Sequence, residues 1–198
     1  MSANLAQAGA YIVQTIFGLY VIAIMLRFLM QVARTDYYNP ICQAIVRITD
    51  PGIKPFSTIL PTFAGVNFAT LGAAFVIQLI AVVLIMMLSG GPVFHPLYIA
   101  WVLVGLFSLI FDIYFYSLII MVIASWIAPY SNHPALTLVQ QLTEPLCGPA
   151  RKLLPPMGGL DFSIILVFLF ITIIDKILVI EPLAYQYLRI PAGLIIGL

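Results

Sequence analysis

The chain carries the same short sequence pattern twice, at an interval of 94 residues. Thr49-Asp50-Pro51 recurs as Thr143-Glu144-Pro145, and the two copies share one gapless register over about 30 residues. The other matched pairs are Asn39-Pro40 with His133-Pro134, Pro55 with Pro149, Leu60-Pro61 with Leu154-Pro155, and Gly65-Val66-Asn67-Phe68 with Gly159-Leu160-Asp161-Phe162. A fixed internal period indicates a tandem duplication. We therefore expect two units built on one plan, residues 1–96 and 97–198.

Too few charged residues are present to cover a soluble particle. Of the 198 residues, 63% are hydrophobic and 8% are charged, which is typical of a chain that lies in a lipid bilayer. Four mostly apolar stretches are long enough to cross a bilayer as helices, at about 10–30, 68–88, 107–128 and 162–180. The third apolar run could also begin at residue 97. The sequence therefore predicts an all-α membrane protein with four transmembrane helices, two in each repeat.

Positive charges mark one side of the predicted bilayer. They are Arg34, Arg47 and Lys54 between the first two spans, and Arg151 and Lys152 between the last two. The middle connection, residues 89–96, contains neither Lys nor Arg. Because positively charged loops stay in the cytoplasm, we expect both long loops there and both termini in the periplasm. Two spans per unit then place the two hairpins in the same sense, as a parallel repeat.

Each long loop begins with a short amphipathic segment. Asn39 is a good helix cap before Pro40, and apolar residues then recur at helical spacing; the counterpart starts at Pro134. The proline of each Thr-acid-Pro motif, Pro51 or Pro145, is expected to end the helix. We expect both helices to lie on the inner membrane surface. There, each apolar face can sink into the headgroup region or receive a protein partner.

Polar residues at the entrances of the returning spans have simple structural roles. Asn67 and Asp161 are predicted to cap the second and fourth spans by accepting hydrogen bonds from free backbone amides. We favour this role over coordination of an ion or ligand. Arg151 and Lys152 are expected to face the anionic inner leaflet.

Several of these motifs together resemble a known family. They are Leu26-Arg27 with Gln31, Tyr38-Asn39-Pro40, Thr143-Glu144-Pro145-Leu146, the stretch from Pro149 to Pro155 and the stretch from Met157 to Ser163. Over nearly its whole length the chain resembles the YggT family of small bacterial membrane proteins. The resemblance implies a protein of the bacterial cytoplasmic membrane with a link to osmotic stress and ion homeostasis. Single-repeat relatives in Gram-positive bacteria and plastids imply roles in division, nucleoid distribution or cytochrome assembly.

Ionisable residues within the spans are the main candidates for a functional contact. Arg27 lies near the inner end of the first span, with Gln31 on the same face, and we expect this pair to anchor the helix to lipid phosphates. Asp112 and Lys176 lie at similar depths by helical rise, so we predict a contact between them near the outer interface. Asp175 and Glu181 are expected to lie nearer water. This contact could serve either assembly or transport.

Three classes of function receive little support from the sequence. No catalytic motif is present, so we predict a protein that is not an enzyme and needs no cofactor. Cys42 and Cys147 occupy non-equivalent places in the repeats, which predicts neither a disulfide nor a metal site. A net charge of +1 argues against nucleic acid as a main partner.

Two classes remain. Our first choice is a membrane scaffold or assembly factor that binds a membrane or cytoplasmic protein through its two loop helices. The alternative is a channel or transporter for potassium or protons, which four spans could form only as an oligomer. Single-repeat relatives imply that two hairpins can associate, so a homo-oligomer is also possible. The apolar C-terminal residues 183–198 are expected to form a tail in the membrane interface.

Overall fold

Four long helices form the body of the molecule. The computed structural model describes residues 2–63, 66–127, 131–154, 163–178, 180–191 and 193–196. Within these residues, four helices are long and apolar enough to cross a membrane, at Asn4–Val32, Phe68–Leu88, Leu97–Ile127 and Ser163–Tyr187. Their large apolar side chains remain exposed along the outer faces, among them Leu19, Leu103, Ile165 and Leu169. A multi-pass membrane protein exposes such side chains to lipid.

The spanning helices follow the predicted pattern with longer ends. They are α1 (Ser2–Val32), α3 (Phe68–Leu88), α4 (Leu97–Ile127) and α6 (Ser163–Thr172), which continues into the π-helical segments η1 (Ile173–Leu178) and η2 (Pro182–Tyr187). The range of α3 coincides with the predicted second span. Helix α4 begins at Leu97, the earlier of the two starts considered. The all-α prediction is confirmed, apart from a two-residue antiparallel pair, β1 (Thr62–Phe63) with β2 (Val66–Asn67).

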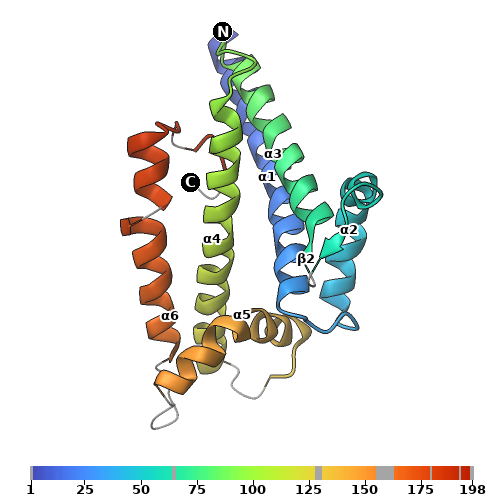
Figure 1. The fold of residues 1–198 in the computed structure, drawn as a ribbon, viewed down its shortest axis with the longest axis vertical. Helices are drawn as coiled ribbons and strands as arrows, with labels where there is room; N and C mark the ends of the chain where they lie inside the picture. The colour runs from blue at the N-terminus through green and yellow to red at the C-terminus, as the bar shows by residue number, and fades with distance from the viewer. Residues whose placement is uncertain are drawn as a thin grey trace.

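Both hairpins run in the same sense. Figure 1 shows α1 and α4 descending from the end that holds the N-terminus, while α3 and α6 return toward it. The long connections, with helices α2 (Pro40–Ser57) and α5 (Pro134–Leu153), lie at the opposite end, which we call the loop end. This arrangement agrees with the predicted parallel repeat.

The loop helices continue beyond the residues where the sequence predicted their ends. Helix α2 passes through Pro51 and Pro55, and α5 passes through Pro145 and Pro149. A proline removes one donor, whereas each loop helix buries an apolar face along its whole length, so packing outweighs the local penalty. The buried residues are Cys42, Thr49 and Ile53 on α2, and Leu138, Leu142, Thr143, Cys147 and Ala150 on α5. The prediction that Pro51 and Pro145 end these helices is therefore wrong.

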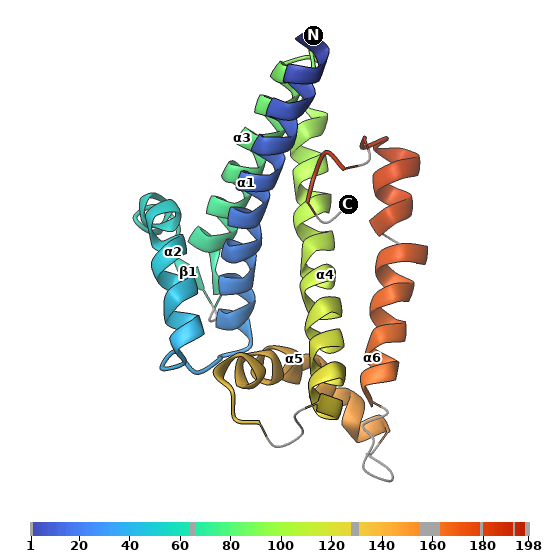
Figure 2. The ribbon, with the colours of Figure 1, turned by 180° about the vertical axis from the view of Figure 1, so that it is seen from behind.

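The two loop helices take different directions. In Figures 1 and 2, α5 lies across the loop end of α4, whereas α2 runs back alongside α1. Gly52 permits this close approach, because a Cβ atom there would lie 2.5 Å from Tyr20 Oη. The equivalent position in the second repeat is Leu146. The expectation that both helices lie flat on one surface is thus not met by α2.

Small residues allow α1 and α3 to pack closely. The buried face of α3 includes Ala69, Ala73, Ala74 and Ala81, and α3 packs against α1, whose buried residues include Ile24 and Met25. Small side chains at a helix contact let two backbones approach, which favours association within lipid.

The C-terminal tail lies inside the helical layer. Ile195 is buried against Gly105 of α4, and Ile196 contacts Gly18 of α1. The Gln14 side-chain amide also donates a hydrogen bond to the Gly193 carbonyl. The expectation of an interfacial tail is therefore wrong for residues 193–196. Because Gly18 and Gly105 lack a side chain, they leave space for Ile196 and Ile195 of this tail.

Candidate functional site at the loop end

Arg27 binds the first copy of the Thr-acid-Pro motif. Its Nη1 donates to Asp50 Oδ1 at 2.7 Å, to Thr49 Oγ1 at 3.0 Å and to the Val46 carbonyl at 3.1 Å. The Arg27 side chain is 13% exposed, and Thr49 is fully buried. Arg27 was expected to reach lipid phosphates. The structure assigns it instead to holding α2 against α1, and Pro51 follows this contact on the exposed side of α2.

The second copy of the motif is held differently. Met121 occupies the position equivalent to Arg27, and Thr143 Oγ1 lies 3.4 Å from its sulfur. Glu144 pairs with Arg151 of the same helix at 2.7 Å, while Pro145 and Lys152 are exposed. The threonine therefore faces the first helix of its hairpin in both repeats. Among the described residues, Asp50 pairs with a spanning helix, whereas Glu144 pairs within its own loop helix.

Two hydrogen bonds join the segment that leads into α2 to helix α5 of the second repeat. The Asp36 amide donates to Gln141 Oε1 at 2.9 Å, and Asn39 Nδ2 donates to the Pro134 carbonyl at 2.7 Å. Asn39 also caps α2, since its Oδ1 accepts from the Ile41 amide at 2.9 Å. The sequence predicted this cap but not the bonds across the repeats.

One of the two predicted span caps lies within the described residues. Asn67 Oδ1 accepts a hydrogen bond from the Ala69 amide at 3.0 Å, which is the predicted cap of α3. Asp161, the cap predicted for the fourth span, lies outside the described residues.

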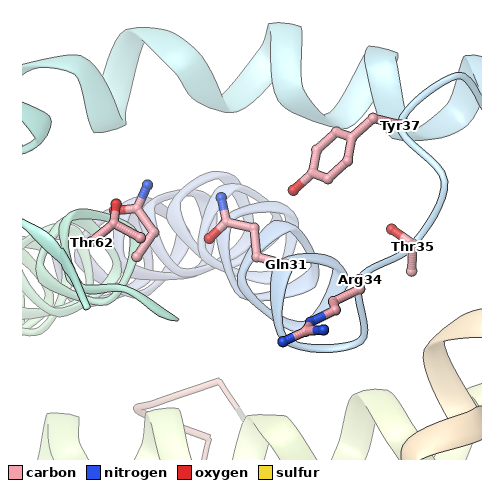
Figure 3. Close-up of a pocket in the computed structure, with 6 residues that line it drawn as sticks. Gln31, Arg34, Thr35, Tyr37 and Thr62 are labelled. Atoms are coloured by element: carbon pink, nitrogen blue, oxygen red, sulfur yellow. The ribbon is translucent and has the colours of Figure 1, made fainter. Parts of the chain in front are cut away.

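A polar pocket opens beside Asn67 at the end of α1. Its volume is about 370 Å³, and it is lined by Gln31, Arg34, Thr35, Tyr37, Thr62 and Asn67. Figure 3 shows Gln31 and Tyr37 extending toward the same space, with Thr62 at its far side. Arg34 has a φ of 53°, an uncommon conformation for a residue other than glycine. Gln31, expected to anchor α1 to lipid together with Arg27, lines this pocket instead.

The pocket is rich in hydrogen-bond donors. Gln31 Oε1 lies 3.5 Å from the Thr70 hydroxyl, and Asn67 Oδ1 is used by the helix cap, so each side chain has its amide N–H group as the donor. The Gln31 side chain also hydrogen-bonds Tyr37. Burial raises the pKa of Tyr37, so its hydroxyl is protonated and can donate at neutral pH. The arrangement suits an oxygen-rich anion.

A second polar cluster lies within the spans of the second repeat. Asp175 is 2% exposed; it accepts from Ser108 Oγ at 2.9 Å and lies 3.4 Å from Lys176 Nζ. Lys176 also pairs with Glu181 at 2.9 Å. Sequence reasoning missed Ser108 and expected Asp175 and Glu181 to lie nearer water.

The predicted contact between Asp112 and Lys176 does not form. Lys176 instead pairs with Glu181 at 2.9 Å and lies 3.4 Å from its neighbour Asp175. Within the described residues no ion pair joins Asp112 to a basic group. Asp112 instead borders an otherwise mostly apolar cavity of about 400 Å³ between α1, α4 and α5.

The two cysteines lie on the buried faces of the loop helices. Cys42 and Cys147 are buried thiols, and burial raises the pKa of Cys42. Among the residues that the structure describes, no group of three His, Cys, Asp or Glu side chains could hold a metal ion.

Together these features define a multi-pass helical membrane protein made of two tandem hairpins. The family model described as CCB3/YggT matches residues 6–88 and 100–181, so the chain belongs to the CCB3/YggT family. It is 46% identical over 178 residues to the uncharacterized protein PA0392 of Pseudomonas aeruginosa, which covers 89% of this chain and 90% of that protein. It is 34% identical over 166 residues to the uncharacterized protein YggT of Escherichia coli K12, a match that covers 83% of this chain and 86% of that protein. No solved structure matches the chain.

Proposed function

We propose that this protein is a non-enzymatic scaffold or assembly factor of the bacterial cytoplasmic membrane, linked to osmotic stress and envelope homeostasis. It binds its partner through the loop end, which faces the cytoplasm. Both termini lie on the periplasmic side. The observation that carries the proposal is the pair of hydrogen bonds from Asp36 and Asn39 to Gln141 and Pro134. Because these bonds tie α2 to α5, a partner would meet one continuous surface.

The outer face of α2 has the composition of a binding surface. Arg47 and Lys54 are exposed there beside the large apolar residue Ile48, which is 59% exposed, and Ile59 follows the helix. A basic and apolar face suits an acidic, amphipathic segment of another protein.

Photo-crosslinking in living cells tests this proposal. A photoreactive residue at Ile48 is expected to yield a discrete protein adduct, whereas one at the exposed α6 position Ile165 yields none. The adduct at Ile48 should weaken in the Arg27→Met variant, because α2 then loses the three hydrogen bonds that it receives from Arg27. Equal adducts at Ile48 and Ile165 would contradict a scaffold that works through its loops.

The alternative function is ion transport by an oligomer, favoured by the buried carboxylate of Asp175 beside Lys176. Purified protein in liposomes separates the two functions. The scaffold proposal expects no specific flux of potassium or protons. A specific flux that is lost in the Asp112→Asn variant would overturn it.

A further inference from the structure

We infer that the loop end of the first repeat binds one anionic phospholipid, with its phosphate in the polar pocket and an acyl chain in an adjoining apolar groove. This inference goes beyond the scaffold function and does not depend on it.

The polar pocket has a net positive lining. Arg34 contributes a guanidinium to the lining, which also includes the uncharged polar side chains of Gln31, Tyr37 and Thr62. No carboxylate lines the pocket, and no ion pair joins Arg34 to a carboxylate within the described residues. The nearest acidic residue in sequence, Asp36, accepts a hydrogen bond from the Tyr38 amide. Arginine and neutral donors without a competing acid favour a phosphate group.

The depth of the pocket is that of a lipid headgroup. Asn67 lines the pocket and directly precedes Phe68, the first residue of the α3 span. Gln31 lies one residue before the end of α1. The pocket therefore lies where apolar span gives way to polar chain, which is the level of phosphates in a bilayer.

A second cavity, an apolar groove lined in part by α1, α3 and α4, includes residues from the same chain segments as the pocket. It has a volume of about 630 Å³ and includes Phe28, Leu60 and Phe68 in its lining. These residues lie within three positions of the pocket residues Gln31, Thr62 and Asn67, so both cavities share three chain segments. A headgroup site that shares walls with an apolar groove suits a phospholipid better than a free anion.

A glycine keeps this groove open. Gly72 lines it, and a Cβ atom at this position would lie 2.7 Å from Leu60 Cδ1. In the second repeat the equivalent residue is Leu166.

The second repeat lacks the residues that form the polar pocket. Ser125, Ala128 and Ser131 stand at the positions equivalent to Gln31, Arg34 and Tyr37. The duplicated chain therefore carries one such site, and we expect one bound lipid per molecule.

Native mass spectrometry of the purified full chain, titrated with dioleoylphosphatidylglycerol, tests the inference. The wild-type protein is expected to retain one lipid. Arg34→Gly should weaken binding at least tenfold, because it removes the cation while glycine accepts the positive φ without strain. Gly72→Leu should weaken binding by filling the groove. Tyr37→Phe provides a milder test of the pocket, with a loss of a few fold.

The controls separate this site from general electrostatic attraction. Arg47→Gln removes an exposed arginine of α2 outside the pocket and should leave lipid retention unchanged. Equal losses in Arg34→Gly and Arg47→Gln, or wild-type retention in Arg34→Gly, would overturn the inference. Binding of uncharged dioleoylglycerol with the same affinity would exclude the phosphate contact. Displacement of the lipid by millimolar inorganic phosphate would identify a site for a soluble anion instead.

Discussion

At the scale of single residues, Arg27 has the most demanding position. Its Nη1 makes all three contacts with α2, while its buried Nε has no hydrogen-bond partner within the described residues. We predict that Arg27→Met, which copies the second repeat, lowers the free energy of unfolding by about 1–3 kcal/mol. Asp50 is 37% exposed, so the loss should fall toward the lower value.

Thermal unfolding in detergent, with Arg47→Met as the exposed control, measures this effect. Arg27→Lys should recover part of the loss, because a single ammonium group can replace a single donating nitrogen. Equal stability of Arg27→Met and the wild type would show that α2 does not depend on this contact.

Ser108 permits a second test at the same scale. Its hydroxyl donates to the buried Asp175, so Ser108→Ala removes one of the carboxylate's partners and should cost about 1–2 kcal/mol. The matched control is Ser125→Ala on the same helix, whose exposed hydroxyl donates only to the Val122 carbonyl. Chemical unfolding in detergent compares the two, and an equal effect of both substitutions would argue against the contact with Asp175.

At the scale of elements, the C-terminal tail fills a space that two glycines leave between α1 and α4. We predict that Gly105→Leu expels the tail, because its new side chain would occupy the place of Ile195. A cysteine introduced at the buried Ile195 should then react rapidly with a thiol reagent in detergent, and slowly when Gly105 is retained. Slow reaction in both proteins would mean that the tail is held by other contacts, such as the bond from Gln14 to Gly193.

The spans and the sense of the hairpins were predictable because hydropathy and repetition are local properties of the sequence. The contact of Arg27 with Asp50 was not, since the two residues are 23 positions apart on different helices. The partner of Lys176 was predicted wrongly because equal depth on two helices does not bring two side chains together, and Lys176 pairs with Asp175 and Glu181 of its own segment. The sequence identifies Arg27 and Lys176 as ionisable groups inside the spans. It does not predict their partners, because these depend on how the helices pack.

At the scale of the whole molecule, duplication has produced two hairpins that share a direction but differ in their loops. The loop helix of the first repeat lies beside the spans, whereas that of the second lies across them. The first repeat has Arg27 and Gly52 where the second has Met121 and Leu146. The polar pocket lies in the first repeat, the apolar groove lies between the first repeat and α4, and the buried carboxylate of Asp175 lies in the second repeat. The copies have therefore become specialised.

The most direct test of the account asks which side of the membrane each end occupies. Single cysteines at the exposed positions Lys54, Lys152 and Val93, in a chain without Cys42 and Cys147, can be labelled in spheroplasts with a membrane-impermeant maleimide. We predict that the cysteine at position 93 reacts before lysis, whereas those at positions 54 and 152 react only afterwards. Labelling of position 54 or 152 before lysis would contradict the cytoplasmic location of the loop helices and the function proposed for them.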